Sequence, residues 1–351
     1  MGPCDRILLN VREENMRHFL GLDAGGTKTY CLVVDELGNV LGFGRAGTGN
    51  YEVYGVEHAR AENEKAVQAA LADAGLTLAD ISAVGMGIAG ADIPEDYVML
   101  EREIYTPLFG DIPRDFQNDS MAGLRGGTRD SFGVVIACGT GCVCAGKNAA
   151  GEHARVGGLG EEFGDECTGS QIGRDGLRRV WQARDGIFGP TEMTSKFVDR
   201  AGCQDIDELF IKLYRRQLTY QDLQPMAKIV FDAASDGDEA AREILVKGGR
   251  YLGAMVNGVA RKLGMTASAF EVVMAGSVFK GSSPALIDAM RAVIVRECPR
   301  AVTVMPAFEP VVGAVLMAME LRLEITGEIY DNLSRQLEAA ESRYQVKFRA
   351  E

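Results

Sequence analysis

Short apolar runs separated by glycine-rich or polar turns dominate the first fifty residues of the chain. One apolar run ends at Asp23, a second covers residues 30–34, and a third starts at Val40. The turns between them are Gly-Gly-Thr at 25–27 and Asp-Glu-Leu-Gly-Asn at 35–39. Short extended segments joined by such turns predict β-hairpins.

The same pattern returns about a third of the way along the chain. Residues 132–138 form an apolar run, Gly-Thr-Gly follows at 139–141, residues 142–145 make a return strand, and 148–151 form a polar turn. A repeated order of strand, glycine turn, strand and turn indicates an internal duplication. Two similar halves, each with a glycine turn, would hold a polyphosphate from two sides.

Elsewhere the apolar pattern alternates between strands and helices, which indicates an α/β protein. The predicted strands are 83–89, 116–119, 270–275 and 302–305. The predicted helices are 55–75, 94–109, one starting at 120, a long one from 164 to 184, a series across 190–265, then 284–297, 310–321 and a charged tail from 324. In the last helix of that series one face is apolar and is expected to be buried; its residues are Leu245, Leu252, Met255, Val259 and Leu263.

Length and composition favour a soluble protein of two domains. The chain has 351 residues, of which 46% are hydrophobic and 25% charged, as in globular enzymes. A net charge of -13 argues against nucleic-acid binding, because such proteins carry a basic face. No apolar run approaches the ~18 residues of a membrane span, so no membrane association is predicted.

The first 15 residues contain acidic side chains and no apolar segment with a cleavage site, so they do not resemble a signal peptide. We expect residues 1–16 to form a disordered leader, with Met16 as the natural start. The eight cysteines are then expected to be reduced thiols, and the protein to be cytoplasmic.

The turn at 25–27 points to an anion site. Its small residues leave backbone N–H groups free to face an anion, and Asp23 at the strand tip can hold a cation beside it. The alternative is a tight hairpin that needs glycine for a positive φ. The second glycine turn at 139–141 and a strand ending in Ala275-Gly276-Ser277, which suits close approach to an adenosine, favour a ligand site.

Two familiar motifs are matched only in part. The residues Gly21-x4-Gly26-Thr27-Lys28-Thr29 differ from a P-loop, because Thr27 separates the glycine from the lysine and a strand follows. The spacing Gly42-x-Gly44-x-x-Gly47 matches a dinucleotide fingerprint, but no amphipathic helix opens after it.

Asp119 is the candidate catalytic base. Phosphoryl transfer requires positioning, a metal that offsets developing charge, and an acceptor for the hydroxyl proton. Asp119 lies at a strand end before a helix, where a cleft between two halves would be. The alternative for Asp119 is an N-cap of the helix that starts at Ser120. Asp165 precedes another predicted helix, and it too could be only an N-cap of that helix. Glu166 would then only stabilise the helix dipole.

Six stretches in order resemble the BadF/BadG/BcrA/BcrD-type ATPase family: LGLDAGGTKTYCLVVD, TGNY, QNDSMAG, ACGTGCVCAG, GGLGEEFGDE and VVMAGSVFKG. Within the sugar kinase/heat-shock ATPase/actin superfamily, the resemblance covers residues 18–322 and points to the N-acetylglucosamine kinase branch. It implies two ribonuclease-H-like (actin-like ATPase) domains flanking a nucleotide cleft, and a homodimer. The implied boundaries are 17–125, 126–310 with a helical insertion, and 311–351 packing back on the first domain.

The resemblance further implies an ATP- and Mg2+-dependent kinase that phosphorylates the 6-hydroxyl of an amino sugar, with N-acetylglucosamine first and glucosamine and N-acetylmuramic acid next. Asp23 would orient hydrated Mg2+, and Asp119 would be the base. The residues implied at the nucleotide are Gly25, Gly26, Thr27, Lys28, Gly139, Thr140, Gly141, Gly276 and Ser277. Those implied at the sugar are Asn50, Asp119, Thr140, Gly158 and Asp165.

Five positions depart from the kinase pattern around the implied sugar pocket. Leu159 stands where these kinases have Trp, Cys167-Thr168 where they have Gly-Ser, and Glu161 and Glu162 are more acidic than usual. The added carboxylates would favour a cationic substrate such as glucosamine, or they face solvent. The identity of the sugar substrate therefore stays open.

Two other functions are compatible with the sequence. Relatives in this family activate enzymes of the benzoyl-CoA reductase/2-hydroxyacyl-CoA dehydratase type through an intersubunit iron–sulfur cluster. The spacing Cys138-x3-Cys142-x-Cys144 lacks the paired CxxC of a zinc site, and buried cysteines pack well in strands. A non-catalytic sensor would not need carboxylates at both Asp23 and Asp119.

Overall fold

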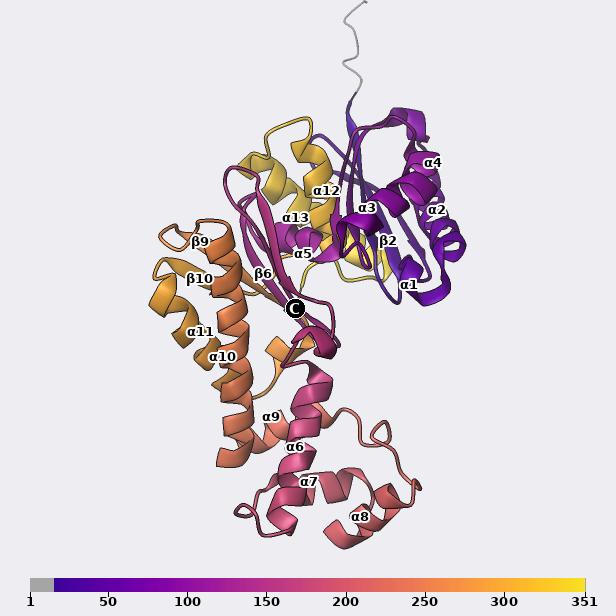
Figure 1. Ribbon diagram of the computed structural model, residues 1–351. Coiled ribbons are helices and arrows are strands. Elements are labelled where there is room, and N and C mark those ends of the chain that lie inside the picture. The colour runs from indigo at the N-terminus through magenta and orange to yellow at the C-terminus, as the bar shows by residue number, and fades with distance from the viewer. Residues whose placement is uncertain (1–15, 351) are drawn as a thin grey trace, which may run out of the picture. The chain divides into compact units, whose positions relative to one another are not determined.

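The computed structural model describes residues 16–350 (Figure 1). The leader predicted for 1–16 lies outside the described residues, apart from Met16. The described chain divides into two compact units. Unit 1 takes the residues up to Gly126 and again from Ala307, and unit 2 spans Gly127–Pro306.

Unit 1 is built on a five-stranded sheet in the order β3-β2-β1-β4-β5. The first three strands form an antiparallel meander, whereas β4 runs parallel to β1 and β5 parallel to β4. This confirms the predicted hairpins. The strands are β1 (His18–Ala24), β2 (Thr29–Asp35), β3 (Val40–Ala46), β4 (Ile81–Ile88) and β5 (Arg114–Asn118).

Helices cover both faces of this sheet, because its central strands are apolar on both sides. Leu20 and Leu22 pack with α2 (Val56–Ala74). Phe19 packs with α12 (Pro310–Glu320) and α13 (Gly327–Tyr344). The remaining helical elements are α1 (Tyr51–Tyr54), α3 (Pro94–Leu100), a π-helical turn (Glu101–Tyr105), α4 (Thr106–Phe109) and α5 (Asp119–Gly127).

Unit 2 repeats the sheet of unit 1 strand for strand, which confirms the duplication. Its order is β10-β9-β6-β7-β8. The strands β6, β7 and β8 are antiparallel, and β9 and β10 run parallel to β6. They are β6 (Gly133–Cys138), β7 (Cys142–Lys147), β8 (His153–Gly157), β9 (Phe270–Ala275) and β10 (Ala301–Val304).

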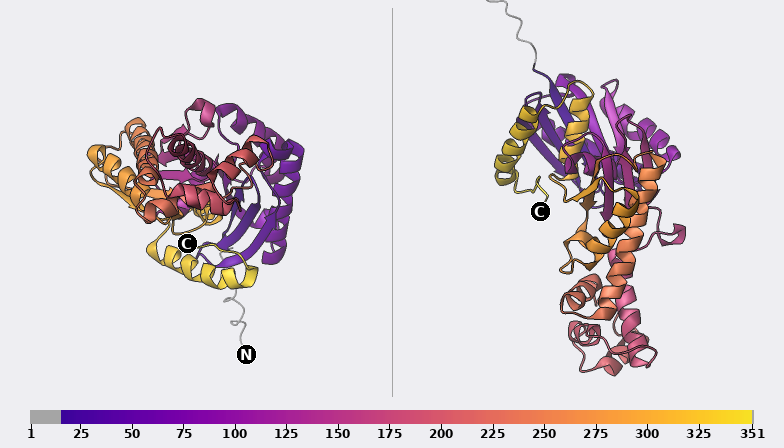
Figure 2. Two further views of the ribbon diagram at one scale, coloured as in Figure 1. Left: turned by 90° about the horizontal axis from the view of Figure 1, so that it is seen from below. Right: turned by 90° about the vertical axis from the view of Figure 1, so that its left-hand side faces the viewer.

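Five helices are inserted between β8 and β9, and α10 and α11 lie side by side (Figure 2). The predicted apolar face from Leu245 to Leu263 is buried, as expected. The inserted helices are α6 (Gly169–Arg184), α7 (Met193–Arg200), α8 (Ile206–Tyr214), α9 (Met226–Ser235) and α10 (Glu239–Lys262), and α11 (Ala285–Glu297) follows β9.

Two local predictions are wrong. Strand β8 was not expected, because its sequence HARVG does not alternate and it forms a half-exposed sheet edge. The helix expected from 164 starts only at Gly169, since the Thr168 hydroxyl caps it by accepting a hydrogen bond from the Gln171 N–H. Among residues 16–350, no helix is long and apolar enough to cross a membrane.

Candidate active site

The first glycine loop (25–28) joins β1 to β2 and is anchored at its base. The Gly25 N–H donates to the Lys28 carbonyl at 2.9 Å, and the Thr48 hydroxyl donates to the Gly25 carbonyl at 3.0 Å. Gly26, Thr27 and Lys28 are exposed. The loop is therefore fixed while its tip stays open to another molecule.

The glycines of this loop are not explained by backbone conformation. Neither Gly25 nor Gly26 has a positive φ, and a Cβ atom added at Gly26 would meet no other atom within 4 Å. The alternative of a hairpin that needs a positive φ is thus wrong. The same holds for Gly141 in the second glycine loop (139–141). Glycine at such positions lets a ligand approach the backbone closely.

Asp23 is the most strongly perturbed carboxyl group of this region. Burial first, and then the negative charges of Asp119 and Glu309, raise its pKa from 3.8 to about 7, whereas the Lys28 ammonium opposes this rise. Part of the side chain still reaches solvent. Unit 1 therefore gathers three carboxyl groups and one ammonium beside the first glycine loop, as is common at functional sites.

The sequence analysis did not single out Glu309. It lies at the N-cap position of α12, and its backbone N–H donates to the Phe348 carbonyl at 2.7 Å. A Cβ atom at Gly21 would lie 2.4 Å from the Val315 nitrogen, so α12 packs directly on β1. This packing brings Glu309 to Asp23, and no local sequence signal announces a contact between such distant segments.

The carboxylates fit a hydrated magnesium ion. Mg2+ keeps several waters and is held by one or two carboxylates, and Asp23 supplies one carboxylate with the negative charge of Asp119 nearby. Within residues 16–350 no group of three or more His, Cys, Asp or Glu side chains is arranged to enclose a metal.

Asp119 is the first residue of α5 and does not cap it. The Asn118 side-chain oxygen accepts hydrogen bonds from the Ser120 N–H at 3.1 Å and the Ser120 hydroxyl at 2.6 Å. The N-cap alternative for Asp119 is thus wrong, since Asn118 has that role. A Cβ atom at Gly87 would lie 3.4 Å from the Cα of Asp119, so β4 closely fixes its position.

Asn50 lies on the same unit as Asp119, beside the turn after β4. Its side-chain oxygen accepts from the Glu52 N–H at 2.8 Å, and a Cβ atom at Gly90 would lie 2.6 Å from that oxygen. The Asn118 amide donates to the Ala91 carbonyl at 3.3 Å. The turn at 90–91 thus contacts both Asn50 and the residue before Asp119.

In unit 2 the predicted nucleotide residues come together. The Gly139 N–H donates to the Gly141 carbonyl at 2.9 Å, which closes the second glycine loop. Gly276 has φ +100°, and a Cβ atom there would lie 2.3 Å from the Cys138 carbonyl oxygen. Only glycine fits at 276, and this packing places Ser277 against Gly139.

Asp165 is almost completely buried and acts on the backbone of the 157–160 loop. Both carboxylate oxygens accept from the Gly158 N–H at 3.0 Å, and one also accepts from the Gly160 N–H at 2.6 Å. The N-cap alternative for Asp165 is wrong. Asp165 instead shapes the loop that carries Gly158.

The positions that depart from the kinase pattern lie on or beside this loop. Leu159 is 49% exposed, and Glu161 forms an ion pair of 2.9 Å with Arg174. Hydrogen bonds from Gln171 and Arg174 lower the pKa of Glu161. Its charge is thus largely balanced within the protein, whereas Glu162 is simply exposed.

Three comparisons relate the chain to known proteins. The sequence model of the BadF/BadG/BcrA/BcrD ATPase family matches residues 20–318. The N-acetyl-D-glucosamine kinase of Dictyostelium discoideum is 29% identical, covering 86% of this chain and 97% of the relative. The N-acetylmuramic acid/N-acetylglucosamine kinase of Clostridium acetobutylicum is 27% identical, covering 86% and 98%.

Solved structures share the fold. A Chromobacterium violaceum protein, provisionally described as an N-acetylglucosamine kinase, has a TM-score of 0.61 at 22% identity, covering 86% of this chain and 99% of that one. The ROK hexokinase of Thermus thermophilus has a TM-score of 0.54 at 18% identity, covering 87% and 100%. These likenesses confirm the predicted α/β fold of the actin-like ATPase type.

Proposed function

The chain belongs to the BadF/BadG/BcrA/BcrD ATPase family, and from this premise we propose that it is an ATP-dependent kinase for the 6-hydroxyl of an amino sugar. The observation that carries the proposal is the carboxylate pair of Asp23 and Asp119 beside an open glycine loop. Phosphoryl transfer requires this combination of an anion cradle, a metal-holding carboxylate and a base.

Each unit carries its own glycine loop with features suited to nucleotide phosphates. In unit 1 the backbone N–H groups of residues 25–27 and the Lys28 ammonium suit phosphate oxygens. In unit 2 the 139–141 loop, with Gly276 and Ser277 packed against it, suits a phosphate and the adenine nucleoside. Support comes from Gly26 and Gly141, whose glycine identity the fold itself does not require.

Asp23 would hold Mg2+ through water. When bound, the ion supplies positive charge that offsets the charge developing on the transferred phosphoryl group. Asp23 has Asp119 and Glu309 nearby, so a cation there also relieves the repulsion among these carboxylates.

Asp119 would accept the proton of the sugar 6-hydroxyl as that oxygen attacks the γ-phosphate. The close packing of α5 on β4 holds its Cα in place, as general-base catalysis requires. Asn50, Thr140, Gly158 and Asp165 are the further sugar residues. Because Asp165 bonds backbone N–H groups on both oxygens, its role would be to hold Gly158 in place for the sugar.

We favour N-acetylglucosamine over glucosamine as the acceptor. The Glu161 carboxylate, which would attract a cationic sugar, is already paired with Arg174. The two relatives with the higher identities are named for N-acetylated sugars, whereas one named glucosamine kinase, from Vibrio cholerae, is 25% identical over 66% of this chain.

The proposal is tested by ADP release from ATP–Mg2+ with a panel of hexoses and amino sugars and a control without sugar. Release that depends on N-acetylglucosamine, with a 6-phosphate product found by mass spectrometry, is expected. Equal release with and without every sugar would overturn the kinase assignment in favour of an ATPase that activates a partner enzyme.

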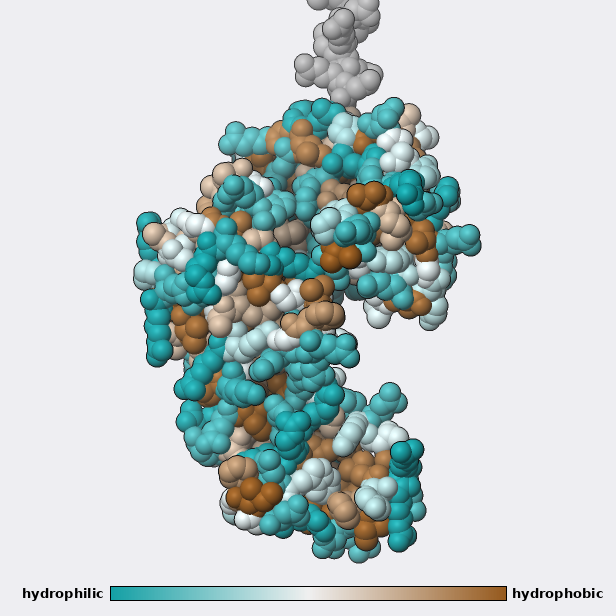
Figure 3. All heavy atoms as spheres, in the orientation of Figure 1, coloured by the Kyte–Doolittle hydropathy of each residue, from teal (hydrophilic) through white to brown (hydrophobic). Residues whose placement is uncertain are grey.

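We also propose that the protein is a homodimer. In the segment inserted into unit 2, aromatic side chains stay exposed, with Phe210 at 38%, Tyr214 at 79% and Tyr220 at 55%. Figure 3 shows hydrophobic residues, in brown, on the surface of this helical part of the molecule. Exposed apolar patches of this kind mark interfaces. Light scattering should give twice the chain mass, and Tyr214→Glu should give the single mass. A monomeric native protein would contradict this.

A cytoplasmic location is proposed from the state of the thiols. All seven cysteines in the described part of the chain are free, and six of them are buried. Free thiols persist in reducing compartments, where disulfides are rare.

A further inference from the structure

A group of thiols lies directly beside the second glycine loop. Cys138 ends β6, Cys142 begins β7, and Cys167 precedes α6, and all three are buried. Hydrogen bonds with Cys142 and then Cys167 are the largest causes that raise the pKa of Cys138, and burial adds to them. The Cys138 thiol therefore keeps its proton and acts as a donor.

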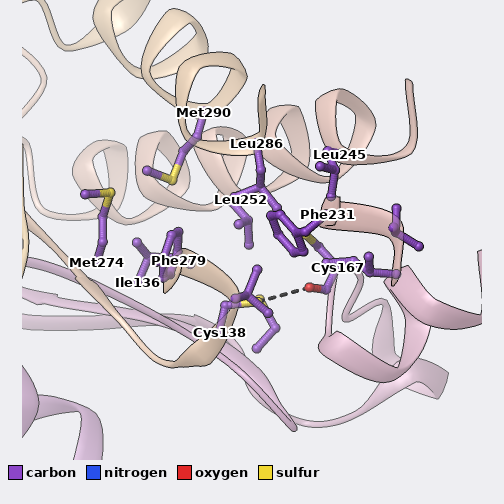
Figure 4. Packing of buried hydrophobic residues seen from close by; sticks show 14 of the residues in the cluster. Ile136, Cys138, Cys167, Phe231, Leu245, Leu252, Met274, Phe279, Leu286 and Met290 are labelled. Carbon is purple, nitrogen blue, oxygen red and sulfur yellow. Dashed lines mark hydrogen bonds between the residues drawn. The ribbon is translucent and has the colours of Figure 1, made fainter. Parts of the chain in front are cut away.

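The Cys138 thiol donates to the main-chain carbonyl of Cys167 at 3.0 Å (Figure 4). The same segment makes a second bond, from the Gly169 N–H to the Gly139 carbonyl at 2.8 Å. The start of α6 is thus joined to the second glycine loop at two adjacent points, one of them a side chain.

Cys167 has an unusual backbone. Its φ of +69° lies in the left-handed region, which costs a non-glycine residue on the order of 1 kcal/mol. The two other non-glycine residues with positive φ among those described, Arg216 and Gln345, are exposed. The Cys167 side chain packs so closely on α10 that a Cβ atom at Gly248 would lie 2.5 Å from its sulfur. This packing holds the carbonyl of Cys167 towards Cys138.

The segment that contains Cys167 is also linked to Asp165 and the 157–160 loop, where two of the proposed sugar residues lie. The Gln171 amide donates to the Asp165 main-chain carbonyl at 3.0 Å. The Asp165 carboxylate in turn binds the N–H groups of Gly158 and Gly160. A continuous set of hydrogen bonds therefore runs from the second glycine loop through residues 165–171 to the 157–160 loop.

We propose that Cys138 is a positioning residue, whose thiol-to-carbonyl hydrogen bond fixes the second glycine loop to the start of α6 for nucleotide binding. This inference rests on the proposed function, because it assigns the 139–141 loop to the nucleotide. The competing explanation is that Cys138 only fills space in the core, in which case its volume matters and its hydrogen does not.

Paired substitutions at two cysteines separate these explanations. At Cys138, serine keeps a donor and alanine removes it. Cys144, two residues into β7, is equally buried, yet its thiol has no hydrogen-bond partner in the described part of the chain. Serine at 144 therefore buries an unpaired hydroxyl, which is costly. The order of stability of the serine and alanine variants should therefore reverse between the two sites. Cys138→Ser should be more stable than Cys138→Ala, whereas Cys144→Ala should be more stable than Cys144→Ser.

The decisive measurement is the affinity for ADP–Mg2+ by isothermal titration calorimetry, which needs neither a sugar nor turnover. Cys138→Ala is expected to weaken ADP binding about fivefold to tenfold, the worth of one net hydrogen bond, and Cys138→Ser to stay within about twofold of the native protein. Both Cys144 variants should bind ADP as the native protein does. Should alanine at 138 not fold, Cys138→Thr and Cys138→Val give the same comparison with matched shapes.

Equal ADP affinities for the two Cys138 variants, or native affinity in Cys138→Ala, would overturn the positioning role while leaving the kinase assignment intact. A native protein that binds no ADP would overturn the proposed function, and the positioning role with it.

Discussion

The two glycine loops occupy equivalent places in two sheets of the same topology, yet their surroundings differ. The first loop (25–28) lies beside the charges of Asp23, Asp119, Glu309 and Lys28. The second loop (139–141) lies beside the Cys138 thiol and Ser277. Duplication supplied the same strand order twice, and the side chains around the two loops then diverged, with carboxyl groups and an ammonium beside the first and a thiol and a hydroxyl beside the second.

The largest expected effect tests the charged half of this comparison. Asp119→Asn should lower turnover about a thousandfold by removing the base, while ADP affinity measured by calorimetry changes little. Asp115→Asn is the matched control, since Asp115 lies on β5, the strand that leads directly into Asp119, and its carboxylate accepts a hydrogen bond from the Gln117 amide. Near-native turnover in Asp119→Asn would refute the assignment of the base.

A second prediction concerns pH and the ligand-free protein. The folded pKa of Asp23, about 7, exceeds its ordinary value of 3.8. Its stabilising contribution is therefore full below that ordinary value and is lost as the pH rises through the folded pKa. Asp23→Asn should raise the unfolding free energy relative to the native protein by about 1–3 kcal/mol at pH 8, and by less at pH 5.

The uncharged loop provides the control for this titration. Ser277→Ala should shift the melting temperature equally at pH 5 and pH 8, because no titrating group is removed. If Asp23→Asn also shows the same shift at both pH values, the charged environment assigned to the first loop is wrong.

The smallest expected effect on activity tests the property that both loops share, an open backbone that a ligand can approach closely. Gly26→Ala and Gly141→Ala should leave the melting temperature nearly unchanged, because the added Cβ meets open space. Each should raise KM for ATP about tenfold by blocking close approach to the backbone. Gly276→Ala should instead lower the melting temperature markedly, given its φ of +100° and the contact with Cys138. An unchanged KM for ATP in both loop variants would contradict the nucleotide-binding role proposed for the two glycine loops.

The sequence predicted the parts of the fold that depend on local pattern. Apolar runs with glycine turns located β1, β2, β6 and β7, and their repetition revealed the duplication. It did not predict β8, whose five residues take their strand conformation from pairing with β7. It also placed the start of α6 too early, because the carboxylate of Asp165 turns back to the 157–160 loop instead of capping a helix.

The candidate site likewise combines features that local sequence predicts with features that depend on packing between distant segments. Asp23 lies near the end of β1 and Asp119 directly after β5, positions visible in sequence, and the electrostatic link between them follows because both strands run parallel to β4. Glu309 joins them only through the packing of α12 against Gly21. The bond between Cys138 and Cys167 likewise depends on a left-handed backbone that no sequence pattern announces.

The contribution of α12 to unit 1 has a consequence for synthesis of the protein. The apolar face of the first sheet, including Phe19 and Leu32, is covered by residues near 311–319. A ribosome makes all of unit 2, with its own separate core, before that cover exists. The first sheet therefore keeps an exposed apolar face until residues 311–319 have been synthesised, and such transiently exposed surface is prone to aggregation.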